Sequence, residues 1–141
     1  MNEEAAAQDY LLAYLQADPA LAAMINGVFT RMTPTDVPFP VVKIDVLDRS
    51  DLMVVGLYRI WSDMTVLVRG IVGNAVHGEE DWSEVRAIAD RIDALLHDHE
   101  DNTSDIRMSS FREESYTNET FEGGKLFLHA GGTYRLRASE P

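Results

Sequence analysis

The sequence contains no cysteine, which excludes disulfide bonds, a thiolate zinc site and a thiol nucleophile. Basic residues are scarce, with 12 lysines and arginines against 24 aspartates and glutamates, so the formal net charge is −12. This balance disfavours electrostatic wrapping of nucleic acid, which needs a basic face, and it is compatible with a basic partner. No apolar run approaches the roughly 20 residues that cross a bilayer. The N-terminus lacks the basic start of a secretory signal. We therefore expect a soluble intracellular protein with no membrane contact.

The length of 141 residues suits one domain with a single core, and we expect that domain to span residues 1–141. The stretch from Asp81 to His97 predicts an amphipathic helix around which the chain is organised. Asp81 and Glu84 resemble a capping box at its start. Its apolar residues recur with a 3.6-residue period and are Trp82, Val85, Ile88, Ala89, Ile92, Leu95 and Leu96.

Further elements follow from periodicity and turn residues. Residues 3–17 predict a helix, and Asp18-Pro19 opens a second, shorter one, because aspartate caps and proline fits the first helical position. Strands are expected over residues 28–32, 41–47, 57–72, 106–116, 125–130 and 133–139. Residues 48–56 are ambiguous, residues 97–102 read as an acidic loop, and residues 117–124 as a turn or mobile arm. The order predicts an α+β fold, with an antiparallel β-sheet and helices packed on one face.

Reactive side chains do not converge at a recognisable spacing. His97 and His99 lie among acids and could ligate a metal, but solvated charges in a loop explain them better. The acids of residues 79–81 favour a helix start, which accounts for them without acid–base catalysis. The two glycine pairs, Gly123-Gly124 and Gly131-Gly132, are not followed by the residues of a phosphate-binding loop. The sequence therefore predicts no catalytic residue, no cofactor and no metal site, and an enzyme is disfavoured.

Two apolar segments fall beside expected loops, where exposed apolar side chains would mark an interaction surface. One interpretation is that both are arms that pack on neighbouring subunits. The alternative is that each forms a local hairpin covering its own core. The residues concerned are Leu52, Met53, Val54, Val55, Phe121, Leu126 and Phe127.

The order and spacing of several segments carry a resemblance over nearly the whole chain. The segments are residues 9–15 (DYLLAYL), 17–21 (ADPAL), 25–29 (INGVF), 38–42 (PFPVV), 84–92 (EVRAIADRI), 95–97 (LLH) and 134–138 (YRLRA). Together they resemble the tail completion family of long-tailed bacteriophages, that is, the tail terminator or head–tail joining proteins.

The resemblance implies a structural virion protein of the tail or neck, assembled in the host cytoplasm. Such proteins form a ring, often a homohexamer, at the head-proximal end of the tail tube, where they stop tube growth and join the tail to the head connector. The implied partners are further copies of the chain, the tail tube protein and a connector or adaptor protein, while DNA passes through without specific binding. A negative lumen would repel DNA phosphates. The acids that we expect to line it are Asp98, Glu100, Asp101 and Asp105.

Two other readings stay open. One is a head–tail adaptor on the portal side of the same assembly. The other is a small acidic protein-binding adaptor unrelated to virions.

Overall fold

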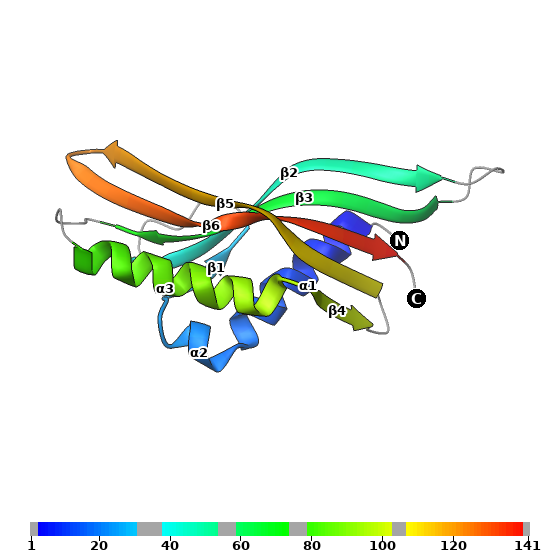
Figure 1. Ribbon diagram of the computed structural model, residues 1–141, viewed down its shortest axis with the longest axis horizontal. Helices are drawn as coiled ribbons and strands as arrows, with labels where there is room; N and C mark the ends of the chain where they lie inside the picture. Colours follow the sequence, from blue (N-terminus) through cyan, green and yellow to red (C-terminus); the bar gives the residue numbers. More distant parts are fainter. Residues whose placement is uncertain (1–2, 31–37, 54–58, 74–78, 103–106, 140–141) are drawn as a thin grey trace.

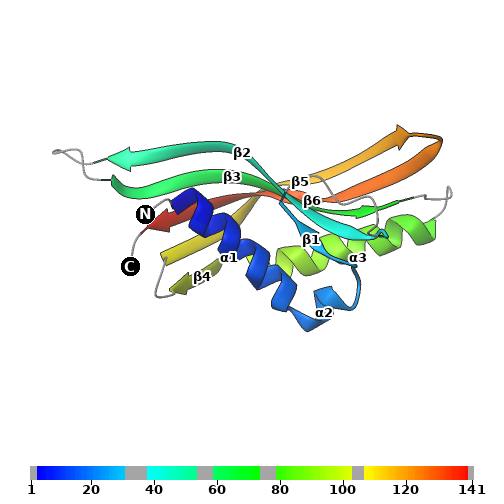
Figure 2. The same ribbon diagram turned by 180° about the vertical axis from the view of Figure 1, so that it is seen from behind.

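The computed structural model describes residues 3–30, 38–53, 59–73, 79–102 and 107–139. The element order is α1 (Glu3–Ala17), α2 (Pro19–Ala22), β1 (Val28–Phe29), β2 (Val41–Met53), β3 (Arg59–Val72), α3 (Glu79–Leu96), β4 (His99–Asn102), β5 (Arg107–Glu122) and β6 (Lys125–Ser139). The strands form one six-stranded sheet in the order β1-β2-β3-β6-β5-β4, which Figures 1 and 2 show from its two sides.

The sheet is mixed, so the expectation of a purely antiparallel sheet is wrong. β1 pairs with β2 in parallel, with Val28 opposite Val42, whereas all other pairs of described strands are antiparallel. A two-residue strand carries no signal for its direction. The long connection between Phe29 and Val41 permits the parallel direction, because parallel neighbours cannot be joined by a tight turn.

Helix α3 has the apolar stripe that its sequence predicts. Val85, Ile88, Ile92 and Leu96 are all fully buried. The helix begins at Glu79, so Asp81 lies within its first turn and not at the cap. At the other end, the buried Ser110 hydroxyl of β5 donates a 2.6 Å hydrogen bond to the carbonyl oxygen of Leu96. This bond satisfies one of the carbonyls that every helix C-terminus leaves free. Within the described residues, no helix is long and apolar enough to span a membrane.

The start of α2 also forms as predicted. The Asp18 side chain caps the helix by accepting a 2.9 Å hydrogen bond from the Leu21 amide, and Pro19 follows in the first turn. The same carboxylate receives two hydrogen bonds from the Arg91 guanidinium of α3, at 2.9 and 2.7 Å. This ion pair lowers the pKa of Asp18 to about 2, through the Arg91 hydrogen bond and the Leu21 amide. Asp18 therefore ties the α2 turn to α3.

The main core lies between the helices and one face of the sheet, which we call the core face. Alternate residues of the central strands point to this face. The buried cluster consists of Ala7, Leu11, Leu15, Leu21, Val28, Val42, Ile44, Met64, Val66, Val68, Ile88, Ile92, Leu96, Met108, Tyr134, Leu136 and Ala138. All three helices contribute residues to this cluster.

Two long hairpins, β2–β3 and β5–β6, point to opposite ends of the molecule (Figure 1). β2 continues to Met53 through part of the ambiguous segment 48–56. β5 continues to Glu122, so most of the expected turn or arm at 117–124 is strand. Its turn is confined to Gly123 and Gly124, whose φ angles of 57° and 76° suit glycine. Cross-strand hydrogen bonds override weak local patterns in both hairpins.

The expected loop at residues 97–102 is also partly wrong. His99 to Asn102 form β4, which pairs antiparallel with Arg107 to Ser110. Asp98 is the one described residue other than glycine with a left-handed conformation, at a φ of 52°, and it turns the chain from α3 into the strand. The segment is polar and has no strand-like composition, so its pairing with β5 decides its structure.

Candidate interaction surface on the second hairpin

The three residues of the β5–β6 hairpin that the sequence predicts as interface residues lie in three different environments. Phe121 is 71% exposed beside the turn. Its cross-strand neighbour Leu126 packs against a small cluster of Val72, Val85, Leu128 and Ala130. Phe127 forms an edge-to-face pair with Phe39, with ring centroids 5.2 Å apart. Phe121 is thus mostly exposed, while Leu126 packs on the chain's own small cluster, and the interface role of these three residues stays a prediction.

The other predicted apolar segment is partly described. Leu52 and Met53 belong to β2, where they pair with Trp61 and Arg59 of β3. Val54 and Val55 lie outside the described residues. The interface role of this segment stays a prediction.

The opposite side of the sheet, which we call the outer face, carries a hollow of about 280 Å³ at the base of the second hairpin. Alternation along the strands brings Lys43 of β2, and Arg69 and Ile71 of β3, to the same face as residues of the hairpin. The lining residues are Phe39, Lys43, Arg69, Ile71, Thr120, Glu122, Phe127 and His129.

His129 is the buried polar side chain of this hollow, at 7% exposure. Its Nε2 lies 2.9 Å from the hydroxyl oxygen of Thr120 on the paired strand. Its Nδ1 has no hydrogen-bond partner among the described residues. Burial, followed by the positive charges of Arg69 and Lys43, lowers the pKa of His129 to about 4. The imidazole is therefore neutral at physiological pH.

Arg69 lies across the hollow, and the described residues engage only part of its guanidinium. Its guanidinium is 3.4 Å from the Asp45 carboxylate and makes one long hydrogen bond, 3.5 Å, to the Tyr116 hydroxyl. Lys43 also pairs with Asp45, at 3.6 Å. Arg69 Nε, like His129 Nδ1, is buried without a partner in the described part of the chain. Buried polar atoms rarely remain unsatisfied in native proteins.

Of the four acids expected to line a lumen, the structure leaves two exposed. Asp98 and Glu100 are exposed in the α3–β4 turn and in β4. Asp101 instead accepts a short hydrogen bond from the Tyr10 hydroxyl of α1. Burial, with the adjacent Asp101, raises the pKa of Tyr10. Asp105 lies outside the described residues.

The two histidines that the sequence weighed as metal ligands have other neighbours. His99 stacks on Tyr14 with ring centroids 4.5 Å apart, and its Nε2 lies 2.9 Å from the Tyr10 hydroxyl. His97 Nδ1 accepts a 3.2 Å hydrogen bond from the Arg112 amide. Among the described residues, no group of three potential ligands could hold a metal ion.

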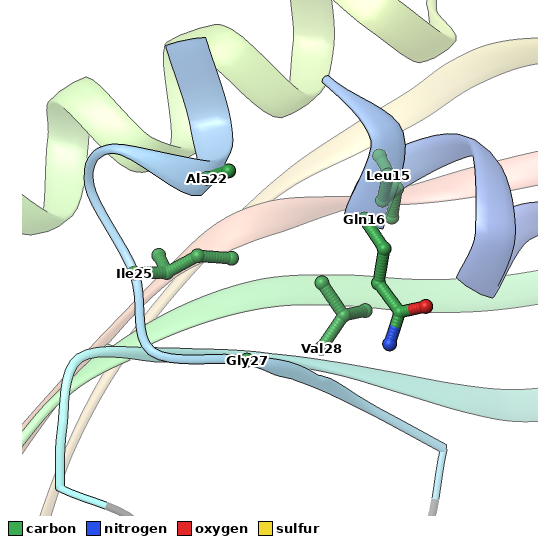
Figure 3. A pocket seen from close by; sticks show the side chains of 6 residues that line it. All are labelled: Leu15, Gln16, Ala22, Ile25, Gly27 and Val28. Carbon is green, nitrogen blue, oxygen red and sulfur yellow. The ribbon is translucent and has the colours of Figure 1, made fainter. Parts of the chain in front are cut away.

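A smaller, apolar hollow of about 100 Å³ lies between the end of α1, α2 and β1. Figure 3 shows Leu15 and Gln16 on one side of it and Ile25 on the other, with Val28 below. Its volume is below the roughly 150 Å³ of a cavity that binds benzene. Its lining is mostly aliphatic and contains no charged or nucleophilic side chain among the described residues.

Sequence reasoning missed the outer-face hollow. The missed residues are Lys43, Arg69 and His129, which lie on three different strands. A signal was present in the alternation of Lys43 with buried Val42 and Ile44. That alternation does not predict the pairing of β3 with β6, which places Ile71 opposite His129.

Comparison with known proteins gives a likeness of fold. No protein-family model and no curated protein matches the chain. A chain of the solved structure titled "Virion of native gene transfer agent (GTA) particle" superposes with a TM-score of 0.64 over 89% of both chains, at 16% sequence identity. The chain therefore shares its fold with a component of that virion.

Proposed function

We propose that the chain is a structural protein of a phage-like virion. In this proposal it forms a ring at the head-proximal end of the tail tube, ends tube growth and joins the tail to the head connector. The virion is its site of action, after assembly in the host cytoplasm. The role is non-enzymatic and requires no cofactor or metal.

The observation that carries the proposal is the likeness in fold to a chain of a virion particle over 89% of both chains. The segments that resemble tail completion proteins are spread over nearly the whole chain, and they favour a role at the end of the tail. The two long hairpins fit a ring, because a closed ring uses a head-to-tail interface with two different patches on each subunit. The exposed Phe121 supplies an apolar anchor for one such patch.

The partners in this proposal are further copies of the chain, the tail tube protein and the connector. The ring that we propose for the copies is a homohexamer. Within the ring, Asp98 and Glu100 face the lumen and repel the phosphates of the passing DNA. Asp101 contributes less, because its carboxylate is engaged by Tyr10.

The decisive experiment is electron microscopy of particles made with the gene disrupted. Overlong tails that are not attached to filled heads support the terminator role. Tails of normal length beside unjoined heads move the protein to the portal-side adaptor. Intact, infectious particles refute both and favour an acidic adaptor unrelated to virions.

A matched pair of variants tests the contact itself. Phe121→Ser should abolish rings of the purified chain in sedimentation velocity, while the melting temperature stays unchanged because the side chain is mostly exposed. Phe111→Ser is the control, since Phe111 is exposed on the same strand at 41% but lies far from the turn. Equal loss of rings in both variants would contradict a contact at the hairpin turn.

A further inference from the structure

The outer-face hollow has more hydrogen-bond donors than acceptors. The Arg69 guanidinium carries five N–H donors, and its contacts with the described residues are the Asp45 ion pair, a 3.5 Å bond to Tyr116 and the Tyr116 ring 5.9 Å from its central carbon. Lys43 adds an ammonium group that is shared with Asp45. The side chains of Arg69 and Lys43 remain 18% and 24% exposed, so a molecule in the hollow can reach them.

The unpartnered buried atoms indicate the kind of group that is missing. Arg69 Nε is a donor in every protonation state, and its missing partner is therefore an acceptor. His129 becomes a second donor in the tautomer with hydrogen on Nδ1, where the Thr120 hydroxyl donates to Nε2. The apolar walls formed by Phe39, Ile71 and Phe127 require that the acceptor be joined to an apolar stem.

We propose that the outer-face hollow binds a carboxylate carried on an apolar stem, held by Arg69 and Lys43 with the Nδ1–H of His129 beneath it. A planar carboxylate can accept two parallel hydrogen bonds from the fork of a guanidinium. Glu122 and Asp45 also border this region, and their charges oppose a doubly charged phosphate more strongly than a carboxylate.

The carboxylate can come from a glutamate of a second copy or from a free small acid. The chain itself offers exposed acids on β5, at Glu113, Glu114 and Glu119. If the carboxylate belongs to a glutamate of a second copy, the inference rests on the proposed function, in which copies of the chain assemble. The binding chemistry stands whether or not the chain forms rings in a virion.

The test is an NMR titration of the full chain, labelled with ¹⁵N in its histidine and arginine side chains. Phenylacetate is the probe, and acetate and inorganic phosphate are the comparison anions. We expect saturable shifts of Arg69 Nε and His129 Nδ1 with phenylacetate, at least tenfold tighter than with acetate because of the apolar walls. An absence of shifts, or equal binding of phosphate, would overturn the proposal.

Variants separate the hollow from nonspecific anion binding. Arg69→Gln should weaken phenylacetate binding at least tenfold, and Lys43→Gln is the milder variant if Arg69→Gln does not fold. Glu122→Gln should strengthen binding, because it removes an opposing charge from the lining. Glu119→Gln is its matched control, since Glu119 lies on the same strand but alternates to the other face. Identical affinities for these last two variants would contradict the proposed location.

Sedimentation in the presence of phenylacetate identifies the source. If the acid dissociates assembled copies while the NMR shifts appear, the hollow binds a glutamate of a second copy. If assembly is unchanged while the shifts appear, the hollow binds a free acid. If rings form but no shifts appear with any acid, the inference fails and the proposed function stands.

Discussion

Replacing Gly131 of β6 with alanine should destabilise the fold strongly, because the backbone of β3 leaves no room for a Cβ atom there. A Cβ atom at this position would lie 2.0 Å from the Val68 carbonyl oxygen and 2.6 Å from the Arg69 Cα atom. Ordinary van der Waals contact begins at 3.4 Å, so the added atom requires a separation of over an ångström. Both contacts are with backbone, and no change of rotamer can relieve them.

The magnitude follows from overpacking of a strand pair at the centre of the sheet. Extra methyl groups in a packed core typically cost about 1–3 kcal/mol, and more when backbone must move. We expect the upper end, about 3 kcal/mol in the free energy of unfolding, which corresponds to roughly 10 °C in melting temperature for a chain of this size.

Urea unfolding, followed by circular dichroism and tryptophan fluorescence, measures this loss as a lower midpoint with an unchanged slope. The control is Gly124→Ala in the β5–β6 turn, where a Cβ atom meets nothing within 4 Å but φ is 76°. The left-handed backbone alone should cost about 1–2 kcal/mol there. The reasoning is refuted if Gly131→Ala unfolds at the urea concentration of the unsubstituted chain, or if its loss does not exceed that of Gly124→Ala.

Three further predictions concern polar contacts. Ser110→Ala should lower the unfolding free energy by about 1–3 kcal/mol, because it leaves the buried Leu96 carbonyl without its donor, and amide exchange should accelerate at the end of α3. Asp18→Asn should lower the free energy of unfolding near neutral pH and make it fall less in acid. The pKa of Asp18 in the folded chain, about 2, lies below its ordinary value. The Arg91 ion pair therefore stabilises the fold above about pH 4, and this stabilisation is lost as the pH falls through 2. Unfolding midpoints between pH 2 and 7 measure this, and parallel curves for both proteins would contradict it. His129→Phe should remove a different pH dependence: its folded pKa of about 4 lies below the unfolded value of 6.5, so the unfolded state binds the proton first. Stability of the parent chain should therefore rise between pH 4 and 6.5 by more than that of the variant in the same denaturation series.

The elements with strong local signals could be predicted from sequence. The apolar stripe of α3 forms as its 3.6-residue period indicates, since one helix face must be buried. Asp18 and Pro19 open α2 because the carboxylate of Asp18 accepts a backbone N–H of the first turn, and the fixed φ of proline suits the first helical position. Val42 and Ile44 alternate into the core with Lys43 outward, as a half-buried strand requires.

Long-range pairing decided the rest. His99 to Asn102 are polar, and they become a strand only because Arg107 to Ser110 supply hydrogen-bond partners. The end of β5 is almost wholly exposed and has no apolar alternation, yet its pairing with β6 continues to Glu122 and Lys125. Local composition cannot encode such partners, because the stabilising bonds involve residues from another part of the chain.

The sequence by itself determined the acidic balance, the mixed helix and strand content, the main helix and the presence of Phe121, Leu126 and Phe127 near one expected turn. Only the tertiary structure decided that Phe121, Leu126 and Phe127 separate into solvent, core and outer face. It also decided that Arg69 and His129 meet in one hollow, because β3 and β6 are neighbours in the sheet although α3, β4 and β5 lie between them in the chain. Periodicity reports which face a residue takes, whereas the neighbours on that face depend on strand order and register, which the whole chain settles cooperatively.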